Sequence, residues 1–291
     1  MNRFLALIGA LLLAFISVSS ACTAAPGQWV HFTLEPQRGG GPEIRASFRN
    51  DDGRRGDNNW STGFRPSELV GLDLAGFHGS GTRPLRFSIV REAGRLDCAG
   101  HGGESYAAGN CSFTADPSFT TELARTGIGR PTEEQAFGLM AVNASRDLIG
   151  AIAEAHYPTP SIDNLMALSA LGVNRGYIGG MAHAGYRPRS LDGLIQFKAL
   201  DITPTWIAEF ARIGYGNLPA EQLVQLKALD ITPAFIGGFD RVGYRHLPVD
   251  QLVQLKAMNI TPEFVQRIAA VDNGLPPVEK LVELKAFDRR R

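Results

Sequence analysis

A period of 29 residues in the C-terminal part of this chain places the strongest constraint on its fold. It is clearest in segments 200–228 and 229–257, which read LDITPTWIAEFARIGYGNLPAEQLVQLKA and LDITPAFIGGFDRVGYRHLPVDQLVQLKA. A fixed period of this length is typical of repeat architectures, in which each unit packs on its neighbours. The period therefore predicts stacked units in place of a single globular core.

Each unit has the signals of a helix start. The position of Thr203 is occupied in every unit by a residue whose side-chain oxygen can cap a helix: Asp116, Ser145, Asn174, Thr203, Thr232 and Thr261. Proline follows in four of these six units, where the first helical residue needs no N–H group. Apolar residues such as Trp206 and Phe210 then recur at a spacing of four and share one helical face. We therefore expect six units, each beginning with a helix.

Each unit also carries the signals of a second helix. Glycine stands at positions 127, 185, 214 and 243, where the first helix needs a left-handed residue to end, and His156 fills the same place as a turn residue. An acid follows near the start of the second helix, at Glu134, Asp163, Asp192, Glu221, Asp250 and Glu279. Because two short helices cannot bury both apolar seams alone, we predict an α-solenoid of six helix-turn-helix repeats over residues 116–291.

The N-terminus predicts export. Residues 1–25 combine a basic start, an apolar run from Phe4 to Val18 and small residues before a polar segment, which together indicate a secretory signal peptide. The run is short for a membrane span, so we expect a periplasmic or extracellular protein without a span after cleavage. A lipid anchor at Cys22 is the alternative fate, although Ser19 stands where lipid-attachment signals usually have an aliphatic residue.

Residues 26–115 predict a small β domain. Polar and apolar residues alternate along 29–34, 44–48 and 85–90, and Gly, Pro and Asp clusters separate these runs. We expect a sandwich or a small barrel, which makes the whole chain α+β with two domains. Cys98 and Cys111 lie in two strand-like pieces around a Gly-rich connection. Export permits disulfides, so we expect these two cysteines to pair across a hairpin.

Charge and motifs argue against several functions. The chain carries 29 basic and 29 acidic residues, so no net field draws it to nucleic acid. We find no zinc-protease, nucleophile-elbow or phosphate-loop motif and no paired-cysteine metal spacing, and we expect no metal, cofactor or catalytic residue. Ser80 has His78 nearby, which keeps a hydrolase with its site in the β domain or between the domains as an alternative. Asp51 and Asp52 are interpreted as a solvated turn.

The best candidate binding residues repeat with the period. They are Gln196, Gln225 and Gln254, and Lys198, Lys227, Lys256 and Lys285, and stacking would arrange them as parallel ladders. One interpretation is a solvated outer face that recent duplication has kept similar. The other is a row of amide and ammonium donors that binds an extended anionic or peptide partner.

The repeat sequence resembles a known family. Units of the form Thr-Pro-x-Phe-Ile, Gly-Tyr and Leu-Pro-x-x-Gln-Leu-Val-Gln-Leu-Lys-Ala are similar to short tandem helical repeats in the periplasmic parts of membrane metallopeptidases of the beta-lactamase-sensor type. Similar repeats also occur in small exported bacterial proteins of unassigned function. The resemblance covers about 116–288, and the segment before it is similar, more weakly, to the β segment that precedes such repeats. The peptidase part is absent, so protease activity does not carry over.

The resemblance and the residue patterns together lead to one expectation. It is an exported, non-enzymatic binding, scaffolding or sensing module of the bacterial envelope, whose partner is a protein or another extended polar molecule. A purely structural envelope protein is a further alternative. Either the β domain or the repeats could contact the partner.

Overall fold

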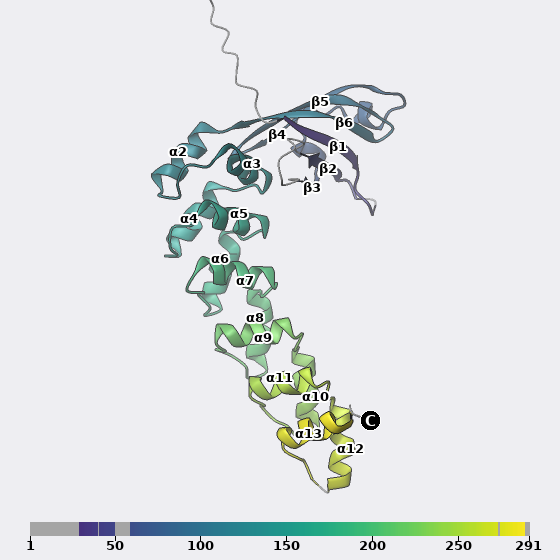
Figure 1. Cartoon of the computed structure of the whole chain (residues 1–291), viewed down its shortest axis with the longest axis vertical. Coiled ribbons are helices and arrows are strands. Elements are labelled where there is room, and N and C mark those ends of the chain that lie inside the picture. The colour runs from purple at the N-terminus through teal and green to yellow at the C-terminus, as the bar shows by residue number, and fades with distance from the viewer. Residues whose placement is uncertain (1–28, 40, 50–58, 273, 289–291) are drawn as a thin grey trace, which may run out of the picture.

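The chain has two parts, a six-stranded antiparallel sheet and a long series of helices (Figure 1). The computed structural model describes residues 29–39, 41–49, 59–272 and 274–288. The predicted signal peptide at 1–25, including Cys22, and the expected turn at Asp51 and Asp52 lie outside these residues. The α+β arrangement predicted from the sequence is confirmed.

The sheet is built from hairpins. Its strands are β1 (Trp29–Pro36), β2 (Ile44–Arg49), β3 (Asn59–Phe64), β4 (Arg83–Arg91), β5 (Gly94–Gly103) and β6 (Tyr106–Ala115). They lie in the order β3-β2-β1-β6-β5-β4 and every neighbouring pair is antiparallel. Alternation along the strands puts Phe32, Phe48 and Leu96 on a buried face and His31 and Ser61 on an exposed one.

The expectation of a sandwich or a barrel is wrong. The described residues form one sheet, and within them its end strands β3 and β4 are not hydrogen-bonded to each other. The sheet curves, so that the guanidinium of Arg91 at the end of β4 lies 5.3 Å from the rings of both Trp60 and Phe64 on β3. Helix α1 (Leu74–His78) and helix α3 (Glu133–Ala141) cover the apolar face, so no second sheet is needed.

Cys98 and Cys111 lie directly opposite each other on β5 and β6, with their sulfurs at disulfide distance. The predicted pairing across a hairpin is confirmed. The turn of this hairpin consists of Glu104 and Ser105, both with positive φ. A short 3-10 helix, Pro66–Glu68, follows β3, and Val70 beyond it forms an isolated bridge to Ser88 that covers part of the β4 edge.

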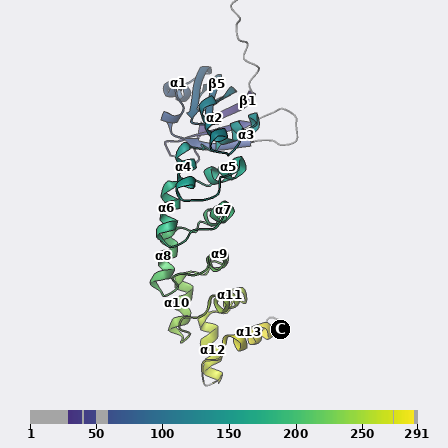
Figure 2. The same cartoon turned by 90° about the vertical axis from the view of Figure 1, so that its left-hand side faces the viewer.

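Twelve α-helices follow the sheet within the described residues. The first helices of the pairs are α2 (Pro117–Arg125), α4 (Arg146–Glu154), α6 (Arg175–His183), α8 (Pro204–Arg212), α10 (Pro233–Arg241) and α12 (Pro262–Asp272). The second helices are α3 (Glu133–Ala141), α5 (Ile162–Ala170), α7 (Leu191–Ala199), α9 (Ala220–Ala228), α11 (Val249–Ala257) and α13 (Val278–Asp288). Both series start in steps of 29 positions. In Figure 2, α4, α6, α8 and α10 form one column, and α5, α7, α9 and α11 form the other.

The predicted helix caps are confirmed at all six first helices. The side chains of the capping residues accept hydrogen bonds from the backbone N–H three positions later; they are Asp116, Ser145, Asn174, Thr203, Thr232 and Thr261. The predicted left-handed residues also have positive φ, at Gly127, His156, Gly185, Gly214 and Gly243. Each cap satisfies a backbone donor that would otherwise be unpaired at the helix end, so these residues fix where each first helix starts.

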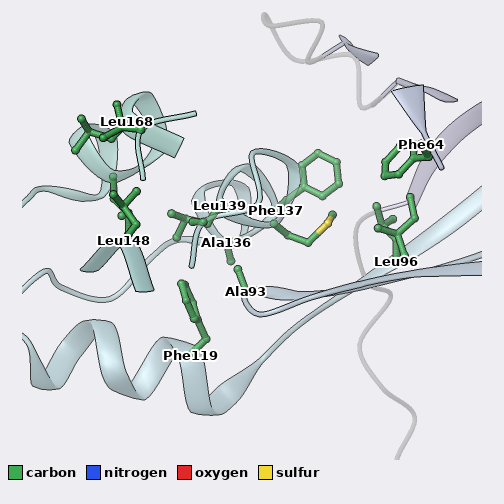
Figure 3. Packing of buried hydrophobic residues seen from close by; sticks show 14 of the residues in the cluster. Phe64, Ala93, Leu96, Phe119, Ala136, Phe137, Leu139, Leu148 and Leu168 are labelled. Atoms are coloured by element: carbon green, nitrogen blue, oxygen red, sulfur yellow. The ribbon is translucent and has the colours of Figure 1, made fainter. Parts of the chain in front are cut away.

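The sheet and the first helices share one core. Figure 3 shows Ala93, between β4 and β5, beside Ala136 of α3, with Phe119 of α2 close by. Phe113 of β6 meets Phe137 of α3 edge-to-face with ring centroids 5.5 Å apart. This cluster continues along the helices to α9, and a second cluster extends from α8 to α13. No flexible linker therefore separates the sheet from the helices.

Two arginines strengthen this junction. Arg91 donates to the backbone oxygens of Met140 and Ala141 at 2.8 and 2.6 Å, where α3 ends. Burial lowers the pKa of its guanidinium, and the charge of Glu68 partly offsets this. Arg146 at the start of α4 bonds Glu92 at 3.0 Å and Glu122 at 2.8 Å. Cations at a helix C-terminus and charge-assisted bonds are both stabilising, so the sheet and the first two helix pairs are held as one body.

Candidate binding surface on the second helices

Each repeated lysine lies over the aromatic ring that begins the first helix of its own pair. The distances from Nζ to the ring centroid are 4.8 Å for Lys198 and Tyr177, 5.3 Å for Lys227 and Trp206, 5.1 Å for Lys256 and Phe235, and 4.8 Å for Lys285 and Phe264. An ammonium above an aromatic face is attracted by the ring quadrupole. The four lysines therefore connect the two helices of the third, fourth, fifth and sixth pairs.

Two lysines also reach the preceding pair. Lys227 Nζ lies 3.7 Å from Asp201 Oδ2, and Lys256 Nζ lies 3.5 Å from Asp230 Oδ2. Lys256 also donates to the backbone oxygen of Asp230 at 2.7 Å. Asp201 and Asp230 have φ near 50°, and each ends a second helix in the left-handed conformation. These contacts attach one helix pair to the next.

The repeated glutamines behave differently. The side chains of Gln196, Gln225 and Gln254 are exposed, and among the described residues none of them makes a side-chain hydrogen bond. They occupy the same position on α7, α9 and α11, which lie in one column in Figure 2. A primary amide has two donors and an acceptor oxygen, so it can pair with another amide or with a backbone peptide group. The three helices thus present a row of unengaged amides, called the glutamine row below.

The structure therefore divides the predicted binding set. The ammonium groups of the lysines are engaged within the fold, while the glutamines face solvent. A binding role for any of the seven residues stays a prediction. Sequence spacing alone could not separate them, because both sets repeat with the same period.

The histidine and serine considered for catalysis are not brought together. Nδ1 of His78 lies 2.9 Å from Oγ of Ser105 on the β5–β6 turn. Ser80 instead accepts a hydrogen bond from the guanidinium of Arg83 through its backbone oxygen. Among the described residues no carboxylate is hydrogen-bonded to His78. Because Ser105 also donates its backbone N–H to Phe77, the His78 contact fits the docking of α1 against the hairpin.

Metal binding and membrane insertion can each be compared with the described residues. No cluster of three or more His, Cys, Asp or Glu side chains has the geometry to hold a metal ion. No helix in the described ranges combines the length and the hydropathy needed to cross a bilayer.

A groove of about 770 Å³ lies at the start of the glutamine row and was not expected from the sequence. It is formed by the loop between α6 and α7 and the loop between α8 and α9, and Gln196 is among its lining residues. Arg187 and Arg189 also line it. The signal in the sequence is that this segment reads GYRPRS where the next two units read GYGNLP and GYRHLP, so that Arg189 stands where both of them have leucine.

No family model, curated protein or solved structure matches this chain.

Proposed function

We propose that this chain is an exported, non-enzymatic binding or scaffolding module of the bacterial envelope, and that its six helix pairs act as an α-solenoid of six repeats. Its partner is a protein or another extended polar molecule. The signal-like residues 1–25 support export, and the Cys98–Cys111 pair is compatible with an oxidising compartment. The resemblance to periplasmic helical repeats agrees with this location.

The observation that carries the proposal is the glutamine row. The residues at this position have no capping, seam or turn role, and their amides are unengaged on three successive second helices. Stacked helices are about 8–10 Å apart, so the row presents amides at regular intervals along an extended surface. Such a surface suits an extended partner, because each successive amide can contact a different segment of the partner.

The alternative function, an envelope hydrolase, would need a nucleophile, a base and an orienting acid in one concave site. The contact between His78 and Ser105 supplies a base and a hydroxyl, but it is exposed and fits a structural role.

The test is a triple variant, Q196A/Q225A/Q254A, in the full-length exported chain. We expect its thermal unfolding to match that of the parent, because the three side chains make no contact that the fold uses. Chemical crosslinking in intact host cells, followed by mass spectrometry, should recover a partner with the parent chain and lose it with the triple variant.

The matched control is T205A/E209A/Q266A, which changes three exposed residues on first helices. It should retain the partner. Equal recovery of partners by the parent and by the glutamine variant would contradict the proposal. The lysines make a poorer test, because Lys227 and Lys256 hold neighbouring pairs together and their loss would also weaken the fold.

A further inference from the structure

The groove beside Gln196 is a polar concavity on the helical part of the chain. Its walls come from two successive helix pairs, the third (α6 and α7) and the fourth (α8 and α9). The third pair contributes Arg187, Arg189 and Gln196, and the fourth contributes Asn217 and Glu221. All five side chains are exposed to solvent. The groove therefore combines cations and amides in one open site.

The equivalent space is filled at the next two junctions. A Cβ placed on Gly214 would lie 3.1 Å from Cε1 of His246, and one on Gly243 would lie 3.2 Å from Cδ2 of Leu275. A Cβ on Gly185 would meet no atom within 4 Å. The residue that corresponds to His246 and Leu275 at this junction is Asn217, whose side chain does not come within 4 Å of a Cβ placed on Gly185. The groove is thus open where the next two junctions are filled.

A tyrosine hydrogen bond is also less well formed at this junction. The hydroxyl of Tyr215 donates to Leu247 O at 2.7 Å, and that of Tyr244 donates to Pro276 O in the same way. Tyr186 occupies the same position, lines the groove and is 9% exposed, and its hydroxyl interacts with the backbone of Leu218 without the geometry of a full hydrogen bond. A buried hydroxyl that is poorly bonded contributes less stability, so this junction differs from the next two.

The charge of the groove favours an anion. Neither Arg187 nor Arg189 forms an ion pair within the described residues, whereas Arg146 pairs with three carboxylates and Arg175 with two. Glu221 is the single acidic residue of the lining, and it lies in the first turn of α9, where a helix dipole favours it. The lining thus contains two guanidinium groups without an ion pair and one carboxylate.

We propose that this groove binds a carboxylate side chain of an extended acidic peptide. Arg187 and Arg189 receive the carboxylate, because a guanidinium fork matches its two oxygens. The amide of Gln196 pairs with the peptide backbone beside it, and the peptide continues past Gln225 and Gln254. A peptide suits the site better than a polyanion does, because the groove holds only two cations and the row that leads from it is neutral. The inference deepens the proposed function and rests on it for the path of the peptide.

The inference can be tested by fluorescence anisotropy with two labelled peptides of about eight residues, a length that spans about 26 Å when extended and so covers three helix pairs. One peptide alternates glycine and glutamate, and the other alternates glycine and glutamine. With the full exported chain at low salt, we expect the acidic peptide to bind about tenfold more tightly than the neutral one. R187Q/R189Q should remove this preference and leave the affinity for the neutral peptide unchanged.

The control is R212Q/R241Q, which neutralises two exposed arginines on first helices that make no ion pair within the described residues. It should retain the preference. Equal affinity of the parent for the two peptides, or an equal loss in both double variants, would overturn the inference. Displacement of the acidic peptide by inorganic phosphate at a far lower concentration than by acetate would do the same and would assign the groove to phosphate.

The outcome also separates this inference from the proposed function. If Q225A/Q254A weakens binding of both peptides while R187Q/R189Q has no effect, the glutamine row stands and the acidic groove is wrong. If the arginine variant removes the preference while Q225A/Q254A changes nothing, the groove stands and the row does not bind. The two results require no knowledge of the natural partner.

Discussion

Two tyrosine-to-phenylalanine substitutions at equivalent positions test whether the junction between the third and fourth helix pairs differs from its neighbour. Tyr215→Phe removes a hydroxyl that donates to the backbone oxygen of Leu247 at 2.7 Å. Tyr186→Phe removes a hydroxyl that makes no well-formed hydrogen bond within the described residues. Both rings keep their packing, so each substitution reports on the hydroxyl alone.

The magnitudes follow from burial. Tyr215 is 6% exposed and Leu247 is 7% exposed, so Tyr215→Phe leaves a carbonyl oxygen unpaired away from water. We expect a loss of about 1–3 kcal/mol in the free energy of unfolding. Tyr186→Phe removes a buried hydroxyl whose contact with the backbone of Leu218 falls short of a full hydrogen bond, so we expect a change close to zero. The two variants should therefore differ by at least about 1 kcal/mol.

Urea unfolding followed by far-ultraviolet circular dichroism measures the difference. Buried side chains form two clusters that meet at α8 and α9, so the transition should also be followed by tryptophan fluorescence. Trp206 contributes to this signal from the meeting point, and Trp29 and Trp60 contribute from the sheet. The denaturant dependence should be the same in all chains, so that midpoints can be compared. Equal destabilisation by the two substitutions would refute the view that this junction is less tightly bonded than the next.

Three further predictions follow from the described contacts. Cys98→Ala/Cys111→Ala should lower the free energy of unfolding by about 3 kcal/mol, because the cysteines are 13 positions apart and their link constrains the unfolded chain; a thermal melt of the oxidised parent and the variant tests this. Burial raises the pKa of Tyr177 and Tyr215 to about 12, so the folded chain retains protons that the unfolded chain releases near pH 10. Stability should therefore be complete below about pH 10 and fall as the pH rises towards 12, and in melts across this range Tyr215→Phe should make the fall shallower. Lys227→Ala should cost about 0.5–2 kcal/mol through its contacts with Trp206 and Asp201, whereas Gln225→Ala should leave the melting temperature within error.

The helical part was largely predictable because its signals are local. Caps such as Asn174 and Thr232 satisfy donors three residues away, and Gly214 or its equivalent supplies a left-handed conformation at a fixed place in the first five units. A second set of left-handed residues, including Asp201 and Asp230, ends the second helices and was not predicted. Their signal is the recurrence of Asn, Gly or Asp at one position of the period, at 143, 172, 201, 230 and 259.

The form of the sheet was not predictable because it depends on contacts between distant residues. Alternation identified the strands, but it could not show whether a second sheet, closure or helices would cover the apolar face. Here α3 and α1 cover it, and Arg91 bridges from β4 to β3 and to the end of α3. The contacts of Arg91 with Met140 and Ala141 span about fifty positions of sequence. No local pattern carries that information.

The candidate surface was only partly predictable, because the sequence locates its residues but not their contacts. The period placed Gln225 and Lys227 together, but only packing shows that Lys227 reaches Trp206 and Asp201 while Gln225 reaches nothing. The groove is open because Asn217 does not reach Gly185, whereas the equivalent residue of the next unit, His246, lies beside Gly214. Such a difference between copies is visible in the sequence once the spatial junction is known.

The most direct test of the proposed binding function is site-specific photo-crosslinking in intact host cells. A photoreactive amino acid replaces Gln225 in one chain and Thr205 in another, since both positions are exposed but lie on opposite members of the fourth helix pair. The account predicts a discrete crosslinked product from position 225, its loss when Gln196 and Gln254 are also changed to alanine, and no such product from position 205. The same products from both positions, or none from position 225, would contradict it.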